Sequence, residues 1–373
     1  MDAAARSATR YSSPRAVIGA LEAQALASRR LGFSVTKACP LRCAHCSVSA
    51  GPELRHMTFG RAFADKVVAE LPQLSAIGIT CIDFTGGEPT LAADFVQRVS
   101  ESAKHVGMAV GVVSAAHWAT SDSQARKFLQ RFRCIDHWDI STDIYHLPFV
   151  SVDKVRRAFD ALSELGRPPM IRIAHHMPIT YDEAVLIDRI HEFAGRRIGF
   201  QPIGPVGRGA ELVRAQHATA DDYDEAPCPT TGPLVRSDGG VSPCCAPLSH
   251  EDYDHPLQLG NAFREPLAVI VGRWRVNPLL QTIRLWGFEP IVQWLRSSPR
   301  LVNSLRSRQC DTCVAMARDR ELMLEAAAAA GRLENRIRVA DALKTYFGEP
   351  WMEEALLAEA DEHMRTRAEE ESA

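Results

Sequence analysis

The sequence predicts an α/β fold: a parallel sheet or barrel, followed by a small cysteine-rich module and a helical C-terminal region. Three observations carry this prediction. Short β-rich runs alternate with longer amphipathic runs between residues 31 and 203, this alternation stops at a Gly- and Pro-rich loop (204–209), and five of the ten cysteines fall within 227–315. Strands that alternate with helices indicate βαβ units and therefore parallel strands.

The elements follow in order along the chain. The first is a helix over residues 13–29, with Ser13 as N-cap and Pro14 at the first helical position. The β-rich runs predict strands over 31–36, 77–84, 109–114, 135–141, 170–175 and 198–203. The amphipathic runs predict helices over 61–71, 95–105, 123–132, 152–165 and 183–193.

These runs divide the chain into five expected regions. A helical extension (1–30) precedes the α/β core (31–205), and a linker (206–226) leads to the cysteine-rich module (227–315). The remaining residues (316–373) are rich in Ala, Glu, Leu and Arg and are expected to form a helical tail that packs on the outside.

Composition excludes several classes of partner. The formal net charge of −3, with both signs mixed along the chain, gives no reason to expect nucleic acid or an anionic membrane. The N-terminus lacks the apolar core of a signal peptide, and no uncharged apolar run reaches the ~18 residues of a membrane helix. We therefore expect a soluble, cytoplasmic protein, in which clustered cysteines indicate metal or catalysis rather than disulfides.

The first cysteine cluster follows the first predicted strand, in T-K-A-C-P-L-R-C-A-H-C, and contains Cys39, Cys43 and Cys46. Thiolates suit iron–sulfur clusters, and three cysteines leave one iron of a cubane without a protein ligand. An open coordination site is where a substrate or cofactor binds. The alternative is a zinc loop, but zinc requires a fourth ligand, and His45 is badly placed between two of the cysteines.

This Cys-x3-Cys-x2-Cys loop after a first strand resembles that of the radical S-adenosylmethionine (SAM) superfamily. The resemblance implies a partial (β/α)6 TIM-like barrel, a 4Fe–4S cluster held by the three cysteines, and SAM on the open iron. In that family the residue before the third cysteine is usually aromatic and contacts the adenine. Here that residue is His45, whose imidazole is able to lie flat on a base.

A second motif ends the second predicted strand with Gly86, Gly87, Glu88 and Pro89. Glycines let the backbone approach a ligand closely. In the radical SAM family this turn binds the methionine amino group of SAM, and we expect the same here.

Polar residues also end later strands. Ser114 ends the third, Ser141 and Asp143 end the fourth, and Arg172 lies on the fifth. Barrel active sites lie at strand C-termini. The resemblance therefore implies contacts to the ribose and carboxylate of SAM, and Arg172 suits a bidentate pair with the carboxylate. Ordinary hydrogen bonding at strand ends is the alternative for each of them.

The second cysteine cluster consists of Cys228, Cys244, Cys310 and Cys313. A Ser-Asp-Gly-Gly turn predicts a hairpin that brings the first two together. Four gathered thiolates form either a zinc knuckle or a fully ligated cluster. Behind a radical SAM core, the pattern resembles the SPASM/twitch auxiliary domain. That resemblance implies one auxiliary 4Fe–4S cluster on these four cysteines, with Cys244 rather than Cys245 as the ligand.

The resemblance implies an enzyme that reductively cleaves SAM to a 5′-deoxyadenosyl radical and abstracts hydrogen from a peptide or small natural product. An auxiliary cluster favours a net oxidation, either a dehydrogenation or a crosslink, with a reductase, flavodoxin or ferredoxin as electron donor. The first alternative is a redox-neutral epimerase in which Cys245 donates a hydrogen atom to the substrate radical. A non-catalytic iron–sulfur or zinc protein is the second. Cys245 is otherwise expected, like Cys81 and Cys134, to be a small apolar residue.

Overall fold

The computed structural model describes residues 24–245, 248 and 255–372. Most of the predicted N-terminal helix, residues 13–23, lies outside this range, and residues 24–27 are helical. No helix among the described residues is both long enough and apolar enough to span a membrane.

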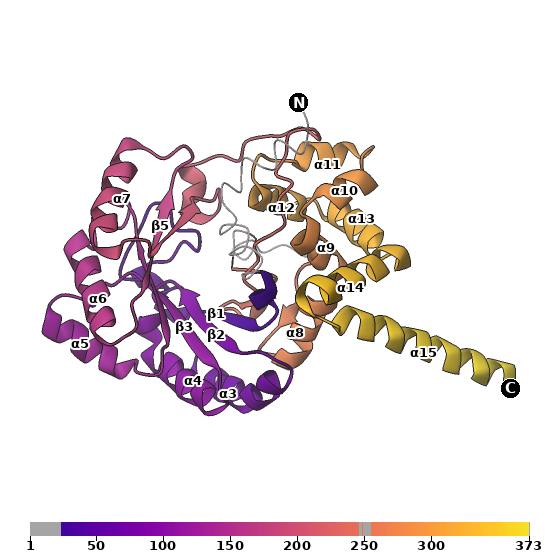
Figure 1. Ribbon diagram of the computed structural model, residues 1–373, viewed down its shortest axis with the longest axis horizontal. Helices are drawn as coiled ribbons and strands as arrows, with labels where there is room; N and C mark the ends of the chain where they lie inside the picture. Colours follow the sequence, from indigo (N-terminus) through magenta and orange to yellow (C-terminus); the bar gives the residue numbers. More distant parts are fainter. Residues whose placement is uncertain (1–23, 246–247, 249–254, 373) are drawn as a thin grey trace.

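Six parallel strands form the larger part of one open, curved sheet (Figure 1). Their bounds are β1 Arg30–Thr36, β2 Cys81–Gly86, β3 Ala109–Ser114, β4 His137–Thr142, β5 Met170–His175 and β6 Ile198–Pro202. The order β6-β5-β4-β3-β2-β1 follows the chain, and each neighbouring pair is parallel, so every connection is a crossover that carries a helix. The sheet does not close on β6, which gives the partial barrel that the sequence predicts.

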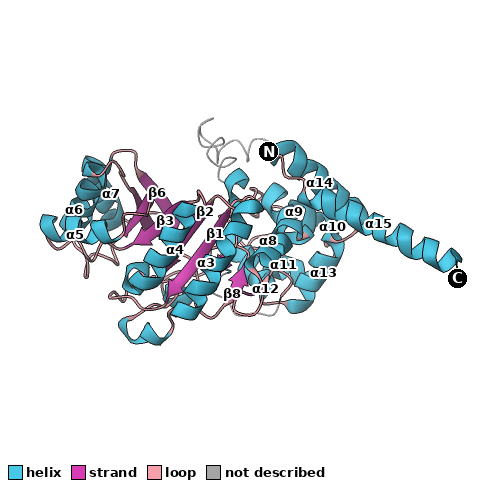
Figure 2. Ribbon diagram, turned by 90° about the horizontal axis from the view of Figure 1, so that it is seen from below, coloured by secondary structure: helices cyan, strands magenta, loops and turns pink. Residues whose placement is uncertain are grey.

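Helices cover the outer face of these strands (Figures 1 and 2). Their bounds are α3 Arg61–Ala76, α4 Ala93–His105, α5 Asp122–Arg131, α6 Val152–Glu164 and α7 Tyr181–Ala194, with short 3-10 turns η1 Pro52–His56, η2 Pro89–Ala92 and η3 Gly207–Glu211. α3 continues past Pro72 to Ala76, beyond the predicted end at residue 71. β2 consequently starts four residues later than predicted, at Cys81, after Gly78 with φ +86°.

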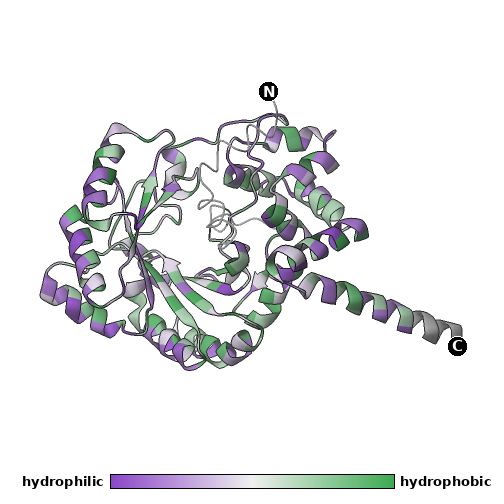
Figure 3. Cartoon of the chain, viewed as in Figure 1, coloured by the Kyte–Doolittle hydropathy of each residue, from purple (hydrophilic) through white to green (hydrophobic). Residues whose placement is uncertain are grey.

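An aromatic cluster fixes the first helices against the sheet. Phe33 of β1 and Phe84 of β2 are fully buried, with ring centroids 6.3 Å apart, and Phe95 of α4 lies 6.1 Å from Phe33. These residues occupy the helix-facing side of their strands, because alternate side chains point to opposite faces. Figure 3 shows the result, with apolar strands inside and polar outer helix faces. The other strand face is left to line the site.

The cysteine-rich module continues the same sheet. β7 Leu234–Val235 pairs in parallel with β1, and β8 Gly240–Ser242 and β9 Gly260–Asn261 follow as antiparallel neighbours. β7 and β8 form the predicted hairpin. The helices that follow are α8 Leu267–Val276, α9 Pro278–Trp286, α10 Glu289–Trp294, α11 Pro299–Ser304, α12 Gln309–Ala317, α13 Arg320–Ala330, α14 Leu333–Phe347 and α15 Trp351–Ser372.

The helical tail differs in part from the prediction that it packs on the outside. α13 contributes Leu322, Met323 and Ala326 to the main hydrophobic core, because one face of this helix is apolar throughout. α14 packs on α9, and only α15 extends away from the body of the molecule (Figure 1).

Candidate active site

The loop after β1 brings its three cysteines to one cavity. Cys39 and Cys43 are buried and Cys46 is half-buried, and all three line a cavity of about 190 Å³ at the C-terminal end of the strands. The loop is fixed by its own backbone, since Cys39 N donates to Gly51 O (3.2 Å) and Cys46 N donates to Cys43 O (3.2 Å). Local structure therefore gathers the thiols without any bridging disulfide.

The environment of these thiols favours metal binding. Burial, together with Glu88, Cys43 and Cys46, raises the pKa of Cys39 to about 12. A buried thiolate is unfavourable without a nearby cation. Iron supplies that cation and displaces the proton, so a loop that holds this thiol together with Cys43 and Cys46 suits an iron–sulfur cluster.

The Gly-Gly-Glu-Pro turn lies directly on the cysteine loop. Gly86 has φ +127°, and a Cβ on Gly87 would stand 2.2 Å from Ala38 O, so only glycine fits. Gly87 N donates to Thr36 O (2.6 Å) and Glu88 N donates to Ala38 O (2.8 Å). Gly86 and Gly87 line the cavity. The turn thus forms part of the cavity wall beside the cysteine loop.

Glu88 lies beneath this wall and does not line the cavity. Its carboxylate is 1% exposed and accepts hydrogen bonds from Thr90 Oγ1 (2.6 Å), Ser114 Oγ (3.2 Å) and Ala115 N (3.0 Å). Burial alone would raise the pKa of Glu88, but His117 and these donors hold it below the usual value. Glu88 therefore joins the ends of β2 and β3, with Pro89 starting η2.

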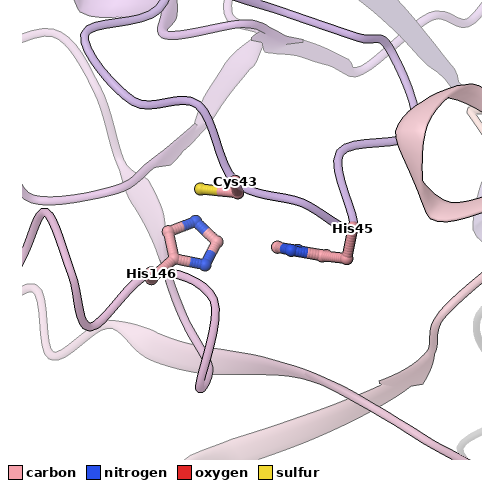
Figure 4. Close-up of side chains that lie close together, drawn as sticks. All are labelled: Cys43, His45 and His146. Carbon is pink, nitrogen blue, oxygen red and sulfur yellow. The ribbon is translucent and has the colours of Figure 1, made fainter. Parts of the chain in front are cut away.

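Asp143 follows β4 and pairs with two histidines, His45 and His146, whose rings Figure 4 shows beside Cys43. Its Oδ2 lies 2.7 Å from His146 Nδ1 and 3.1 Å from His45 Nε2, and its Oδ1 accepts from the backbone N of Tyr145 and His146. Burial opposes ionisation, yet these partners hold the pKa of Asp143 well below its usual range. Burial alone would lower the pKa of His146, whereas Asp143 raises it to about 10.

Several of the residues predicted to contact SAM line the cavity but already have partners within the protein. His45, Ser114, Ser141, Asp143 and Arg172 all line the cavity with the glycines. Both oxygens of Asp143 are already bonded to protein donors, and Arg172 Nη2 pairs with Asp139 Oδ2. His45 stacks on Tyr145, with ring centroids 5.3 Å apart. Direct contact with SAM stays a prediction for each of these residues.

Sequence reasoning missed two residues of this cavity. His146 lies three residues beyond Asp143 on the turn after β4, where an Asp-x-x-His spacing would have indicated the pair. Arg208 comes from the Gly- and Pro-rich loop after β6. Its Nε donates to Cys43 O (3.0 Å), and its Nη2 is buried without a hydrogen-bond partner among the described residues. No local pattern marks Arg208, because its partner lies far away in the sequence.

The second cysteine cluster surrounds a smaller cavity of about 80 Å³. Cys228, Cys244, Cys310 and Cys313 line it with Cys245, and the other walls include Ile283 and Phe288. Burial and the neighbouring thiols raise the pKa of Cys228 and Cys313, and burial raises that of Cys310 to about 11. Four half-buried thiols that line one cavity with apolar walls fit a fully ligated iron–sulfur cluster.

Cys245 lies between two cavities. It lines the auxiliary cavity and also a chamber of about 260 Å³ inside the barrel, and its Sγ is 2.8 Å from Thr231 Oγ1. The chamber shares Thr85, Gly86 and Arg172 with the first cavity. The chamber inside the barrel therefore borders the cavities of both cysteine clusters.

Comparison with known proteins agrees with this geometry. The radical SAM superfamily matches residues 33–190, and the iron–sulfur cluster-binding domain SPASM matches residues 228–313. No curated protein matches the chain in sequence.

Several solved structures are similar to part of this chain. Native anSMEcpe with bound AdoMet shares 13% identity over 65% of this chain and 79% of its own, with a TM-score of 0.43. BtrN in complex with AdoMet and 2-DOIA shares 14% identity over 69% of this chain and 87% of its own, with a TM-score of 0.41. Polyhistidine-tagged anSMEcpe with bound AdoMet shares 13% over 84% and 98%, with a TM-score of 0.46. No residue role is carried over from them.

Proposed function

This chain belongs to the radical SAM superfamily and carries a SPASM-type iron–sulfur domain, and from this we propose that it oxidises a peptide or small natural-product substrate by hydrogen abstraction. One observation carries the proposal. The cavity of the three-cysteine loop and the cavity of the four-cysteine cluster both border one chamber inside the barrel. A substrate in that chamber lies between the two clusters.

The residues of the first cavity have separate tasks in this proposal. Cys39, Cys43 and Cys46 hold three irons of a 4Fe–4S cluster, and the fourth is left for SAM. When bound, the reduced cluster and SAM together supply methionine and a 5′-deoxyadenosyl radical. Gly86 and Gly87 let the backbone approach the methionine end of SAM, and His45 lies against the adenine.

The second cluster supports oxidation as the net reaction. A substrate C–H bond gives its hydrogen atom to the 5′-deoxyadenosyl radical. The resulting carbon radical then releases one electron and one proton, which leaves a double bond or a new crosslink. Cys228, Cys244, Cys310 and Cys313 hold the electron acceptor. The electron that cleaves SAM comes from a reductase, flavodoxin or ferredoxin.

A redox-neutral epimerase is the second candidate, and the position of Cys245 favours it. The thiol lines the substrate chamber, where it is able to return a hydrogen atom to the carbon radical. The thiyl radical formed is reduced by one electron from the auxiliary cluster and one proton from solvent. This route needs the same clusters but leaves the oxidation state of the substrate unchanged.

A test in deuterated water separates the two reactions. The reconstituted enzyme is incubated with SAM, dithionite and fractions of peptides and polar metabolites, and a substrate is recognised because it raises 5′-deoxyadenosine above the substrate-free level. Oxidation gives a product that has lost two hydrogens and carries no deuterium at carbon. One deuterium at carbon, lost in Cys245→Ala but retained in the control Cys134→Ala, would establish the epimerase instead.

A further inference from the structure

One cysteine of the first cluster has a histidine against its sulfur. Cys43 is 6% exposed and His146 is 9% exposed. A ligand atom from each of Cys43, His45 and His146 lies within 4.8 Å of the other two. Figure 4 shows a ring nitrogen of His146 turned toward the Cys43 sulfur. The two side chains come from separate loops, after β1 and after β4, so the fold itself creates this contact.

Asp143 determines which nitrogen faces the sulfur. His146 Nδ1 lies 2.7 Å from Asp143 Oδ2, so Nε2 is the nitrogen on the Cys43 side. Asp143 is in turn held by backbone N–H donors from Tyr145 (2.9 Å) and His146 (3.0 Å), and it is 1% exposed. The carboxylate therefore leaves the imidazole little freedom to rotate.

Within the part of the chain that the structure describes, the other two cysteines of the loop meet backbone donors. Cys46 Sγ accepts from the backbone N of Ala50 at 3.4 Å, and Cys39 is bonded to the backbone of Leu41. A backbone amide is a neutral donor, whereas a histidine paired with a carboxylate is strongly polarised. The three sulfurs are thus placed in unequal surroundings, and Cys43 is the one that faces a histidine paired with a carboxylate.

We propose that His146, oriented by Asp143, donates a hydrogen bond to the Cys43 thiolate and raises the reduction potential of the SAM-binding cluster. This inference rests on the proposed function, because it takes Cys43 as a cluster ligand. A ligating thiolate only accepts, so the facing Nε2 must carry the hydrogen. A donor at the sulfur stabilises the additional negative charge of the reduced cluster. His146 acts here as a positioning residue, through Cys43, and requires no contact with the substrate.

The test is a redox titration of reconstituted holoenzyme, followed by the electron paramagnetic resonance (EPR) signal that changes when SAM is added. His146→Leu removes the donor and is expected to lower the reduced-to-oxidised ratio at a fixed potential about tenfold, equivalent to about 59 mV for one electron. His146→Gln keeps an N–H on that side and should recover most of this shift. Iron content should match the wild type in both variants.

His176 provides a matched control. It too has Nδ1 on a buried carboxylate, Glu183 Oε1 at 2.8 Å, but it belongs to no such group with a cysteine among the described residues. His176→Leu should leave the potential unchanged. Asp143→Asn frees the imidazole and should shift the potential in the same direction as His146→Leu, by less, which keeps the test available if the leucine variant does not fold.

Two results would overturn the inference. An unchanged potential in His146→Leu with full iron would remove the redox role. Loss of iron in both His146 variants, with strong nitrogen coupling in pulsed EPR of the wild type, would identify His146 as a ligand. Failure of the proposed function is distinguishable: wild-type enzyme would form no 5′-deoxyadenosine, while the cluster potential still responded to His146.

Discussion

At the scale of single residues, the defining feature of the molecule is the number of buried thiols without a disulfide. All ten cysteines lie in the described part of the chain, and none of them is in a disulfide. Burial raises the pKa of Cys39 to about 12 and that of Cys310 to about 11. The metal-free fold therefore retains protons that iron would displace, which makes cluster assembly a proton-releasing step.

This produces a pH-dependent stability of the metal-free protein. In the folded protein the pKa values of Cys39 and Cys310 exceed the ordinary 9.0. The contribution of these protonated thiols to the free energy of unfolding is therefore complete below pH 9 and is lost as pH rises toward about 11 to 12. Denaturant unfolding of the metal-free protein should show a falling free energy of unfolding over this range. Cys310→Ser should reduce the fall, and the iron-loaded protein should lack this contribution. Identical curves for all three forms would contradict the prediction.

At the scale of elements, the contact between the Gly-Gly-Glu-Pro turn and the cysteine loop leaves no room for an added side chain. A Cβ at Gly87 would stand 2.2 Å from Ala38 O. Gly87→Ala should therefore displace the loop and reduce iron bound at the first cluster, while the auxiliary cluster is retained. Iron and sulfide analysis with EPR of the two clusters measures this.

Gly60 supplies the control for that substitution. It is the N-cap of α3, and a Cβ there would meet nothing within 4 Å. Gly60→Ala should bind iron like the wild type. Equal iron in Gly87→Ala and Gly60→Ala would show that the turn does not constrain the cysteine loop.

A second inter-element contact joins both ends of the described chain to the auxiliary cluster. Arg284 of α9 and Glu349, before α15, form a bidentate pair with side chains 0% and 4% exposed. Ser28 Oγ donates to the same carboxylate (2.7 Å), and Gln24 Nε2 donates to Cys228 O (3.1 Å). The segment of Cys228 is thereby fixed by Gln24 near the start of the described chain, which also donates to the backbone of Arg284.

Breaking this pair should be costly because one charge would remain buried. Glu349→Gln is expected to lower the free energy of unfolding by about 3–5 kcal/mol, whereas Arg284→Met/Glu349→Leu should lower it by less than the single changes combined. The exposed pair Arg336–Glu359 is the control, and Glu359→Gln should cost below about 1 kcal/mol. Equal losses at both pairs in denaturant titrations would contradict a role for burial.

At the scale of the whole molecule, local pattern was sufficient for the order of elements and for the first cysteine cluster. β3 and β5 begin and end where the sequence predicts them, and a turn glycine with positive φ precedes each, Gly107 and Gly166. α3 ends later and β2 starts later than the sequence predicts, because Pro72 is accommodated inside the helix. Spacing also indicated that Cys39, Cys43 and Cys46 gather, because they lie on one short loop. The second set, Cys228, Cys244, Cys310 and Cys313, came from the resemblance to the SPASM/twitch domain.

Contacts between distant segments were not predictable. Arg208 reaches Cys43, and Gln24 reaches Cys228, over separations that no local pattern encodes. The tail was expected outside, but α13 completes the core, since an alanine-rich face is able to approach its neighbours closely. The position of the chamber beside both cysteine cavities likewise depends on tertiary packing. This position is what favours a substrate between the clusters.

Anaerobic reconstitution with iron and sulfide, followed by SAM and dithionite, tests the central claim most directly. We predict about eight irons per chain, for two 4Fe–4S clusters, and 5′-deoxyadenosine that disappears when Cys39, Cys43 and Cys46 are changed to Ala. Changing Cys310 and Cys313 to Ala should leave about four irons. Bound zinc in place of iron, with no 5′-deoxyadenosine, would contradict the assignment of both clusters and of the radical reaction.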